Sequence, residues 1–204
     1  MSTKIARIRI ELEHIAPRIW RRVDVSLTTN LRALHEIIQA VMPWENYHLY
    51  QFAVGERVYG EPDPEDAVWG RKIYQAKGMR LGTLVDRGVT ELLYTYDFGD
   101  DWQHRVILEE VIEATAGTDY PLFIDGERTA PPEDVGGPPG FMDFVEAMAK
   151  TRHPQRKDLV RWYGGPFNPV DFCAEQIAES IREIAVKRKA ALEAFERSRR
   201  KRLH

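Results

Sequence analysis

The chain has 204 residues, of which 43% are hydrophobic, and a formal net charge of −3. This composition excludes wholesale disorder, and the length fits one domain or one domain with an appendage. The single cysteine excludes an internal disulfide, and no apolar run approaches the ~18 residues that span a bilayer. We therefore expect a soluble, cytoplasmic protein with no membrane partner.

The charge is distributed unevenly along the chain. Residues 187–204 contain eight Lys/Arg and two Glu, which gives +6, so residues 1–186 carry −9. Residues 91–135 contain twelve Asp/Glu and two Arg, which gives −10. An acidic centre and a basic tail can attract different partners, or each other.

The first quarter of the chain predicts the start of an α+β fold. Apolar and polar residues alternate over 4–12 and more loosely over 18–27, which predicts an antiparallel strand pair. Thr28, Thr29 and Asn30 are candidate N-caps for a helix over 31–42, and residues 48–54 read as a third strand. This order indicates a mainly antiparallel, mixed sheet with a helix packed on one face, and it is compatible with a β-grasp-like arrangement.

The remaining elements are less regular. Glycines and prolines interrupt residues 55–80, which we read as an excursion, and residues 113–140 as a long loop with an extended piece at 120–124. We expect a helical turn at 81–86, a hairpin of 91–98 with 102–112, short helices at 141–150 and 158–163, and a long C-terminal helix over 171–197. The predicted organisation is a single α+β domain over 1–196, including the helical C-terminal part, and a basic, frayed tail over 197–204.

The predicted hairpin tip concentrates chemistry. Around Gly99 it holds the carboxylates Asp97, Asp100 and Asp101, the imidazole of His104, and four aromatic rings that include Trp102. Turn preference alone explains each aspartate, and a hydrogen bond within the core explains the histidine. Three carboxylates at one tip nevertheless repel each other unless a cation, an arginine or solvent relieves them.

Two registers of the hairpin are considered. A three-residue tip, Gly99 to Asp101, would place Tyr96 opposite His104 on one apolar face, and burial favours this register. A two-residue tip would instead pair Asp97 with His104, and a carboxylate can orient and charge an imidazole. Asp97 and His104 are accordingly the candidate catalytic residues.

A second constellation lies in the Pro- and Gly-rich loop 130–140. Glu133 and Asp134 would extend the acidic tip into a carboxylate-rich pocket if the loop lies beside it, although a structural lead into the next helix explains the loop equally well. The expectation is no cofactor, with Mg²⁺ or Ca²⁺ as the alternative, because both ions prefer oxygen ligands. The candidate metal ligands are Asp97, Asp100, Asp101, Glu133 and Asp134.

Other polar residues carry weaker signals. His35 on the first helix and His48, which opens the third strand, are each more often packed, hydrogen-bonded histidines than ligands. Trp20, between Arg18 and Arg21, is compatible with a phosphate-facing surface, and an amphipathic strand explains it equally well.

Several blocks together resemble one family. They are Ile19 to Arg22, Leu34 to Gln39, Trp44 to Phe52, Tyr96 to His104 and Pro131 to Gly137. In this order they resemble the plasmid pRiA ORF-three-like family, named for an open reading frame of a root-inducing plasmid, from about residue 4 to about residue 175. The resemblance implies an α+β fold and little established function.

The family resemblance also implies two differences from this chain. Members are often labelled transposon resolvases, but no serine here has a persuasive catalytic setting, so we reject the recombinase interpretation. Many members carry cysteines near the Pro-Pro-Glu-Asp segment, where this chain has Phe123, Ala130 and Val135. A thiolate metal site in those relatives would therefore be absent here.

The sequence favours a non-enzymatic binding or accessory protein linked to mobile elements. Its recognition surface would comprise the tip and the Pro-rich loop, with the binding residues Asp100, Asp101, Trp102, Glu133 and Asp134. The basic tail would add weak, salt-sensitive contact with nucleic acid through Arg199, Arg200, Lys201 and Arg202, and a solvated helix end is the competing interpretation. The alternative function is a divalent-metal-dependent hydrolase that uses the carboxylate cluster, with His104 as general acid or base.

Overall fold

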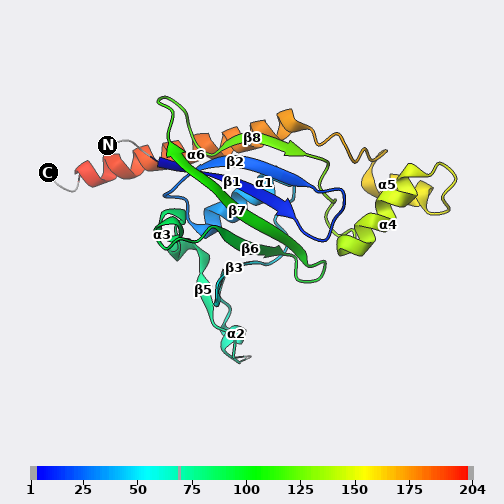
Figure 1. Cartoon of the computed structure of the whole chain (residues 1–204), viewed down its shortest axis with the longest axis horizontal. Coiled ribbons are helices and arrows are strands. Elements are labelled where there is room, and N and C mark those ends of the chain that lie inside the picture. Colours follow the sequence, from blue (N-terminus) through cyan, green and yellow to red (C-terminus); the bar gives the residue numbers. More distant parts are fainter. Residues whose placement is uncertain (1–3, 69, 202–204) are drawn as a thin grey trace.

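The computed structural model describes residues 4–68 and 70–201. Its centre is an eight-stranded sheet in the order β5-β4-β3-β6-β7-β1-β2-β8, in which only β4 and β5 pair in parallel (Figure 1). The strands are β1 (Lys4–Leu12), β2 (Trp20–Ser26), β3 (Tyr50–Val54), β4 (Arg57–Gly60), β5 (Ile73–Gln75), β6 (Glu91–Tyr96), β7 (Trp102–Glu113) and β8 (Leu122–Glu127). The predicted mainly antiparallel α+β fold is confirmed.

The described part of the chain contains six α-helices and one 3₁₀ turn. The described helices are α1 (Leu31–Val41), α2 (Pro64–Val68), the 3₁₀ turn η1 (Ala76–Gly78), α3 (Leu81–Asp86), α4 (Gly137–Ala149), α5 (Arg156–Tyr163) and α6 (Ala174–Lys201). α1 and α6 contact each other and lie behind the sheet in Figure 1, while α4 and α5 sit beside one end of it. None of these helices combines the length and apolar character needed to cross a bilayer.

The main core lies between α1 and the sheet. Asn30 caps the N-terminus of α1, since its side chain accepts a hydrogen bond from Ala33 N at 2.9 Å. The apolar stripe of α1 is wholly buried and belongs to the same core cluster as the even-numbered apolar residues of β1. These residues are Leu31, Leu34, Ile37, Ile38, Val41, Ala6, Ile8, Ile10 and Leu12. Buried apolar residues recur about every 3.6 positions in the helix and every second position in the strand, as the sequence predicts, and the two apolar faces pack together.

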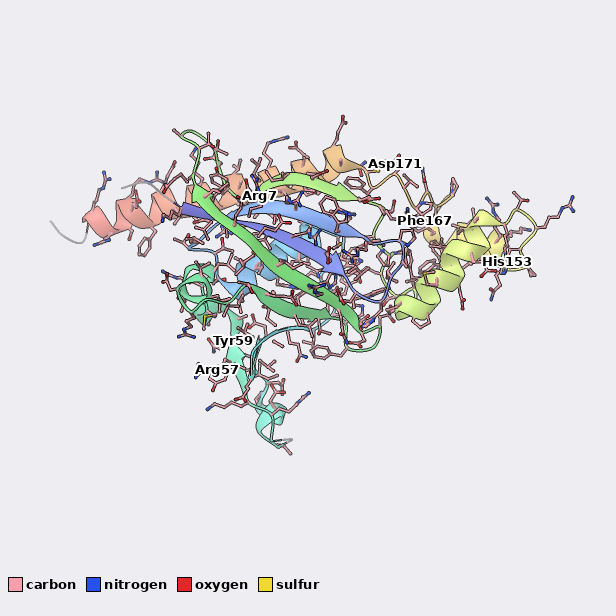
Figure 2. All side chains as sticks on the ribbon, in the orientation of Figure 1. Arg7, Arg57, Tyr59, His153, Phe167 and Asp171 are labelled. Carbon is pink, nitrogen blue, oxygen red and sulfur yellow. The ribbon has the colours of Figure 1, made fainter. Side chains whose placement is uncertain are left out.

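The opposite face of the sheet is covered by paired charges. Arg7, which lies on the open face in Figure 2, binds Asp24 at 2.8 Å and Glu110 at 3.0 Å. Arg22 binds Glu109 at 2.7 Å. Ion pairs near solvent contribute only about 0–1 kcal/mol each to the stability of the fold. The burial of apolar side chains between α1 and the sheet is therefore the larger stabilising contribution. Ion pairs therefore line the face of the sheet opposite to α1.

The predicted elements agree with the structure except in the excursion, at the ends of elements, and in β8, which was expected only as an extended piece at 120–124 of a long loop. The strand pair β4 and β5 and the helices α2 and η1 were not predicted, because Gly60, Pro62 and Gly70 interrupt any recognisable period. α4 begins at Gly137 rather than near residue 141, since prolines are tolerated in a first helical turn. α6 continues to Lys201, so the described part of the basic tail is helical.

Candidate functional site

Three segments far apart in the sequence meet at one end of the sheet. They are the loop 42–49 after α1, the hairpin tip 97–101, and the Pro-rich loop 131–137. Trp44 Nε1 donates to Pro131 O at 2.8 Å, and Gly136 N donates to Asp100 Oδ2 at 3.0 Å. The acidic tip therefore touches the Pro-rich loop, which is the arrangement that the metal and recognition hypotheses both need.

The hairpin tip has five residues, so both predicted registers are wrong. Tyr96 pairs with Trp102 and Tyr94 with His104. Asp97 and Asp101 both have left-handed backbone, with φ of 54° and 53°, and Asp101 N donates to Asp97 O at 2.7 Å to close the loop. Aspartate tolerates this conformation, which allows a longer tip than a simple turn. The predicted apolar face, with Tyr94, Tyr96, Trp102 and His104, is nevertheless buried as expected.

His104 lies in the core and not at the tip. Its ring is fully buried between Trp44 and Tyr94, with ring centroids 5.2 and 5.3 Å away, and Nδ1 donates to Trp102 O at 3.1 Å. Burial lowers the pKa of His104 to about 3, so the imidazole is neutral. The structure thus separates His104 from Asp97, its expected catalytic partner, and from the solvent that a general acid or base would need.

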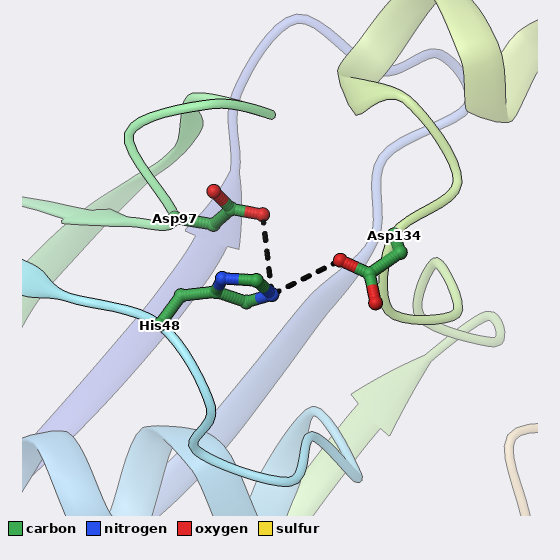
Figure 3. A group of neighbouring side chains, drawn as sticks. All are labelled: His48, Asp97 and Asp134. Carbon is green, nitrogen blue, oxygen red and sulfur yellow. Dashed lines mark hydrogen bonds and ion pairs between the residues drawn. The ribbon is translucent and has the colours of Figure 1, made fainter.

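A different histidine meets the carboxylates. His48 Nε2 lies 3.0 Å from Asp134 Oδ1 and 3.6 Å from Asp97 Oδ2, and one ligand atom from each of the three residues lies within 4.8 Å of the others (Figure 3). Asp97 is buried, His48 is half-buried and Asp134 is exposed. We call this group the His48 cluster. It opens to solvent on the Asp134 side.

The other expected site residues have structural partners. Asp101 Oδ2 accepts from Gln103 Nε2 at 2.8 Å, and Asp100 holds the Pro-rich loop as described above. Glu133 Oε1 accepts from Glu45 N at 2.8 Å and from the Tyr96 hydroxyl at 3.0 Å. Trp102 is fully buried, so it supports the tip from below and presents no surface to a partner.

A buried polar network positions the loop that carries His48. His35 Nε2 donates to Asn46 Oδ1 at 2.7 Å, and Asn46 N donates to Gln39 Oε1 at 3.1 Å. Because an amide oxygen only accepts hydrogen bonds, the proton of the neutral His35 ring must be on Nε2. Nδ1 is therefore unprotonated and accepts a hydrogen bond from the Tyr94 hydroxyl at 2.7 Å. Burial lowers the pKa of His35 to about 4, so this neutral tautomer persists at physiological pH. Two turns of α1 therefore hold the loop against β6.

Sequence reasoning missed His48 as a member of the site. The missing information is the pairing of β3 with β6, in which Tyr50 lies opposite Tyr96. Two residues further out, the same antiparallel register brings His48 beside the hairpin tip. Without knowledge of that pairing, a histidine two residues before a strand is only a weak indication of a functional site.

The basic tail lies apart from the His48 cluster. Arg199 and Arg200 are exposed near the end of α6, which projects beyond the sheet (Figure 1). Only the backbone of Lys201 is described, and Arg202 lies outside the described residues.

The comparison with known sequences gives the family. Residues 4–176 match the family described as plasmid pRiA4b ORF-3-like protein. The chain belongs to this family. The family covers the sheet, the His48 cluster and the first residues of α6.

Two relatives match nearly the whole chain. Uncharacterized protein y4hQ of Sinorhizobium fredii is 36% identical over 189 residues, which cover 92% of this chain and 95% of the relative. The crystal structure of the protein of unknown function MM3350 from Methanosarcina mazei Go1 is similar with a TM-score of 0.78 and 34% identity, and it covers 86% of this chain and 97% of that one. The MM3350 protein therefore shares the fold of this chain, and the names of these two relatives state no activity.

The close approach of the two loops generates a prediction about Gly137. This residue has φ +67°, and a Cβ there would lie 2.4 Å from Asp100 O. We expect Gly137→Ala to lower the free energy of unfolding by about 3 kcal/mol. The left-handed backbone disfavours alanine, and the new Cβ would overlap with Asp100 O. Urea unfolding monitored by tryptophan fluorescence measures the loss.

Gly117→Ala is the matched control for backbone strain. Gly117 has φ +78° and no atom within 4 Å of a Cβ, so only the left-handed backbone should cost about 1–2 kcal/mol. Equal losses in the two variants would contradict a tight contact between the tip and the Pro-rich loop.

Proposed function

We propose that this protein is a divalent-cation-binding accessory protein, with the cation held by His48, Asp97 and Asp134. The supporting observation is the convergence of one imidazole nitrogen and two carboxylate oxygens, from three separate segments, within 4.8 Å. A bound cation would also relieve the repulsion between the two carboxylates. Without a cation, His48 attracts the carboxylates of Asp97 and Asp134 electrostatically only when its imidazole is protonated.

The ligand set favours particular metals. Mg²⁺ and Ca²⁺ are usually bound by oxygen alone, whereas an imidazole with carboxylates suits Mn²⁺ or Zn²⁺. Three protein ligands leave coordination positions for water or for a group from a partner. We therefore place Mn²⁺ and Zn²⁺ ahead of the Mg²⁺ and Ca²⁺ that the carboxylates alone suggested.

The surroundings of the His48 cluster suit recognition of a partner. Tyr47, Leu49 and Phe98 are large apolar side chains that are 69%, 66% and 46% exposed, and they come from the same loop and hairpin tip as His48 and Asp97. Exposed apolar groups next to charged groups are typical of interaction sites. In this proposal the cation fixes the loops and the apolar side chains contact the partner.

Isothermal titration with Mn²⁺, Zn²⁺, Mg²⁺ and Ca²⁺ tests cation binding. We expect one site per chain for Mn²⁺ or Zn²⁺, and about tenfold or weaker affinity in Asp134→Asn, which removes one ligand charge. Asp101→Asn is the matched control, since it removes the same charge from the adjoining hairpin tip, outside the His48 cluster. Asparagine suits the left-handed backbone of both positions, with φ of 56° and 53°.

Two results would contradict the cation site. One is no binding of any of the four ions near millimolar concentration by the folded protein. The other is an equal loss of affinity in both variants, which would mean that only the general negative charge of the hairpin tip and the Pro-rich loop attracts the ions.

A second candidate function is metal-dependent hydrolysis, and Glu133 supports it. Glu133 Oε2 is buried and has no hydrogen-bond partner among the described residues, although Oε1 has two. Such a carboxylate oxygen, adjacent in the chain to the ligand Asp134, is a candidate general base for a metal-bound water.

Glu133→Gln separates the two functions. Hydrolysis predicts release of nitrophenolate from a phosphodiester or ester by the Mn²⁺-loaded protein, at least 100-fold slower in Glu133→Gln, with unchanged Mn²⁺ affinity. Absence of turnover in the loaded wild-type protein would remove the hydrolase and leave the accessory protein.

Nucleic-acid contact by the tail and an association with mobile elements are finer parts of this proposal. The plasmid reading frame in the family's description supports the association. Exposed Arg199 and Arg200 would give weak, salt-sensitive binding in the cytoplasm. Deletion of 197–204 should weaken binding of duplex DNA at low salt, whereas Arg152→Ala with Lys157→Ala, which removes two exposed charges elsewhere, should not. Equal affinity of the deleted and full chains would contradict the contact.

A further inference from the structure

Arg21 is a buried cation without an anionic partner. Its side chain is 0% exposed, and among the described residues no carboxylate oxygen lies within 4.0 Å of it. Nε donates to Val41 O at 2.9 Å, and Nη1 donates to Trp20 O at 2.8 Å and to Glu127 O at 2.9 Å. Nη2 is buried and has no hydrogen-bond partner in the described part of the chain.

The fold explains only part of this arrangement. Val41 ends α1, so a cation here stabilises the negative end of the helix dipole. Burial lowers the pKa of Arg21 to about 10, which still leaves the guanidinium charged at neutral pH. A buried charged donor without a hydrogen-bond partner is costly, and native proteins rarely leave one unpaired. Nη2 therefore needs an acceptor that the described residues do not supply.

Arg21 lines a groove of about 650 Å³. The groove runs between the loop after α1, the Pro-rich loop and the segment that leads into α6. Its aromatic lining consists of Tyr47, Trp162, Tyr163 and Phe172. The ring of Phe172 lies over the guanidinium, with Arg21 Cζ 4.6 Å from the ring centroid. The aromatic lining of the groove thus adjoins the guanidinium of Arg21.

Gly126 of β8 makes this stacking possible. A Cβ at Gly126 would lie 2.8 Å from Arg21 Cδ and 3.4 Å from Phe172 Cε2. Any larger residue would displace the arginine or press on the ring that covers it. The strand, the arginine and the ring are therefore fitted to one another.

The charges of the groove select the kind of anion. Glu45, Glu133, Asp134 and Asp171 line the same groove as Arg21, and Asp171 lies before α6 in Figure 2. A dianionic phosphate would meet repulsion from four carboxylates. A single carboxylate on an aromatic body would place one negative charge on Arg21 and its ring among the aromatic side chains.

We propose that the groove binds a small aromatic carboxylate, whose oxygen accepts a hydrogen bond from Arg21 Nη2. Phe172, which precedes α6 in a segment without regular structure, shifts from the guanidinium to admit it and then packs on its ring. Arg21 is not part of the His48 cluster, although Asp134 belongs to that cluster and also lines the groove, so the test is made without added divalent cations.

The test uses the full-length protein and NMR of its arginine side chains and backbone amides. Phenylacetate is the probe, phenylacetamide is its neutral counterpart, and inorganic phosphate is the competing oxyanion, all at constant ionic strength. We expect saturable shifts of the Arg21 side-chain and Phe172 amide signals with millimolar phenylacetate. Phenylacetamide and phosphate should produce at least tenfold weaker binding.

Matched lysine variants assign the contact. Arg21→Lys, which keeps the charge and loses the forked donors, should weaken phenylacetate binding about tenfold or more. Arg22→Lys changes the neighbouring arginine, which pairs with Glu109 on the other face of the sheet, and should leave binding unchanged. The wild-type titration stands by itself if Arg21→Lys does not fold, since Arg21 also binds the end of α1.

Three outcomes would overturn the proposal. The first is no change at Arg21, which would leave a structural water as the acceptor for Nη2. The second is an equal response to phenylacetamide, which would show that only the ring is recognised. The third is tighter binding of phosphate than of phenylacetate.

Discussion

The hydroxyl group of Tyr96 joins all three segments of the candidate site. It accepts a hydrogen bond from Tyr47 N at 3.1 Å and donates one to Glu133 Oε1 at 3.0 Å, while its own ring lies at the end of β6. The ring is fully buried and stacks on Trp44 at a centroid distance of 5.1 Å. Burial raises the pKa of Tyr96, so the hydroxyl remains a donor to Glu133 at all physiological pH values.

The remaining contacts of the site depend on this junction. With Glu133 held, the next residue, Asp134, projects toward His48. With the loop after α1 held, His48 stays beside Asp97. The His35 network beneath is fully hydrogen-bonded, and satisfied buried polar groups make a structure specific and rigid. Loops positioned by a rigid scaffold are where binding groups concentrate, and this end of the sheet fits that rule.

The sequence predicted the elements better than their meeting points. Local periodicity was sufficient for α1, for the hairpin and for α6, because each buries one face with a regular spacing. It could not give the hairpin register, since two aspartates with left-handed backbone lengthen the tip to five residues. It could not give the His48 cluster, because His48 reaches Asp97 only through the pairing of β3 with β6. Arg21 appeared to belong to an amphipathic strand surface, and only the tertiary structure places it under Phe172.

Anomalous diffraction from crystals grown with Mn²⁺ tests the central claim most directly. We expect one strong peak bounded by His48 Nε2, Asp97 Oδ2 and Asp134 Oδ1, with the three segments in the arrangement of Figure 3. A peak only at other carboxylates would contradict a cation site at this junction. So would the absence of any peak at a Mn²⁺ concentration that saturates the protein in solution.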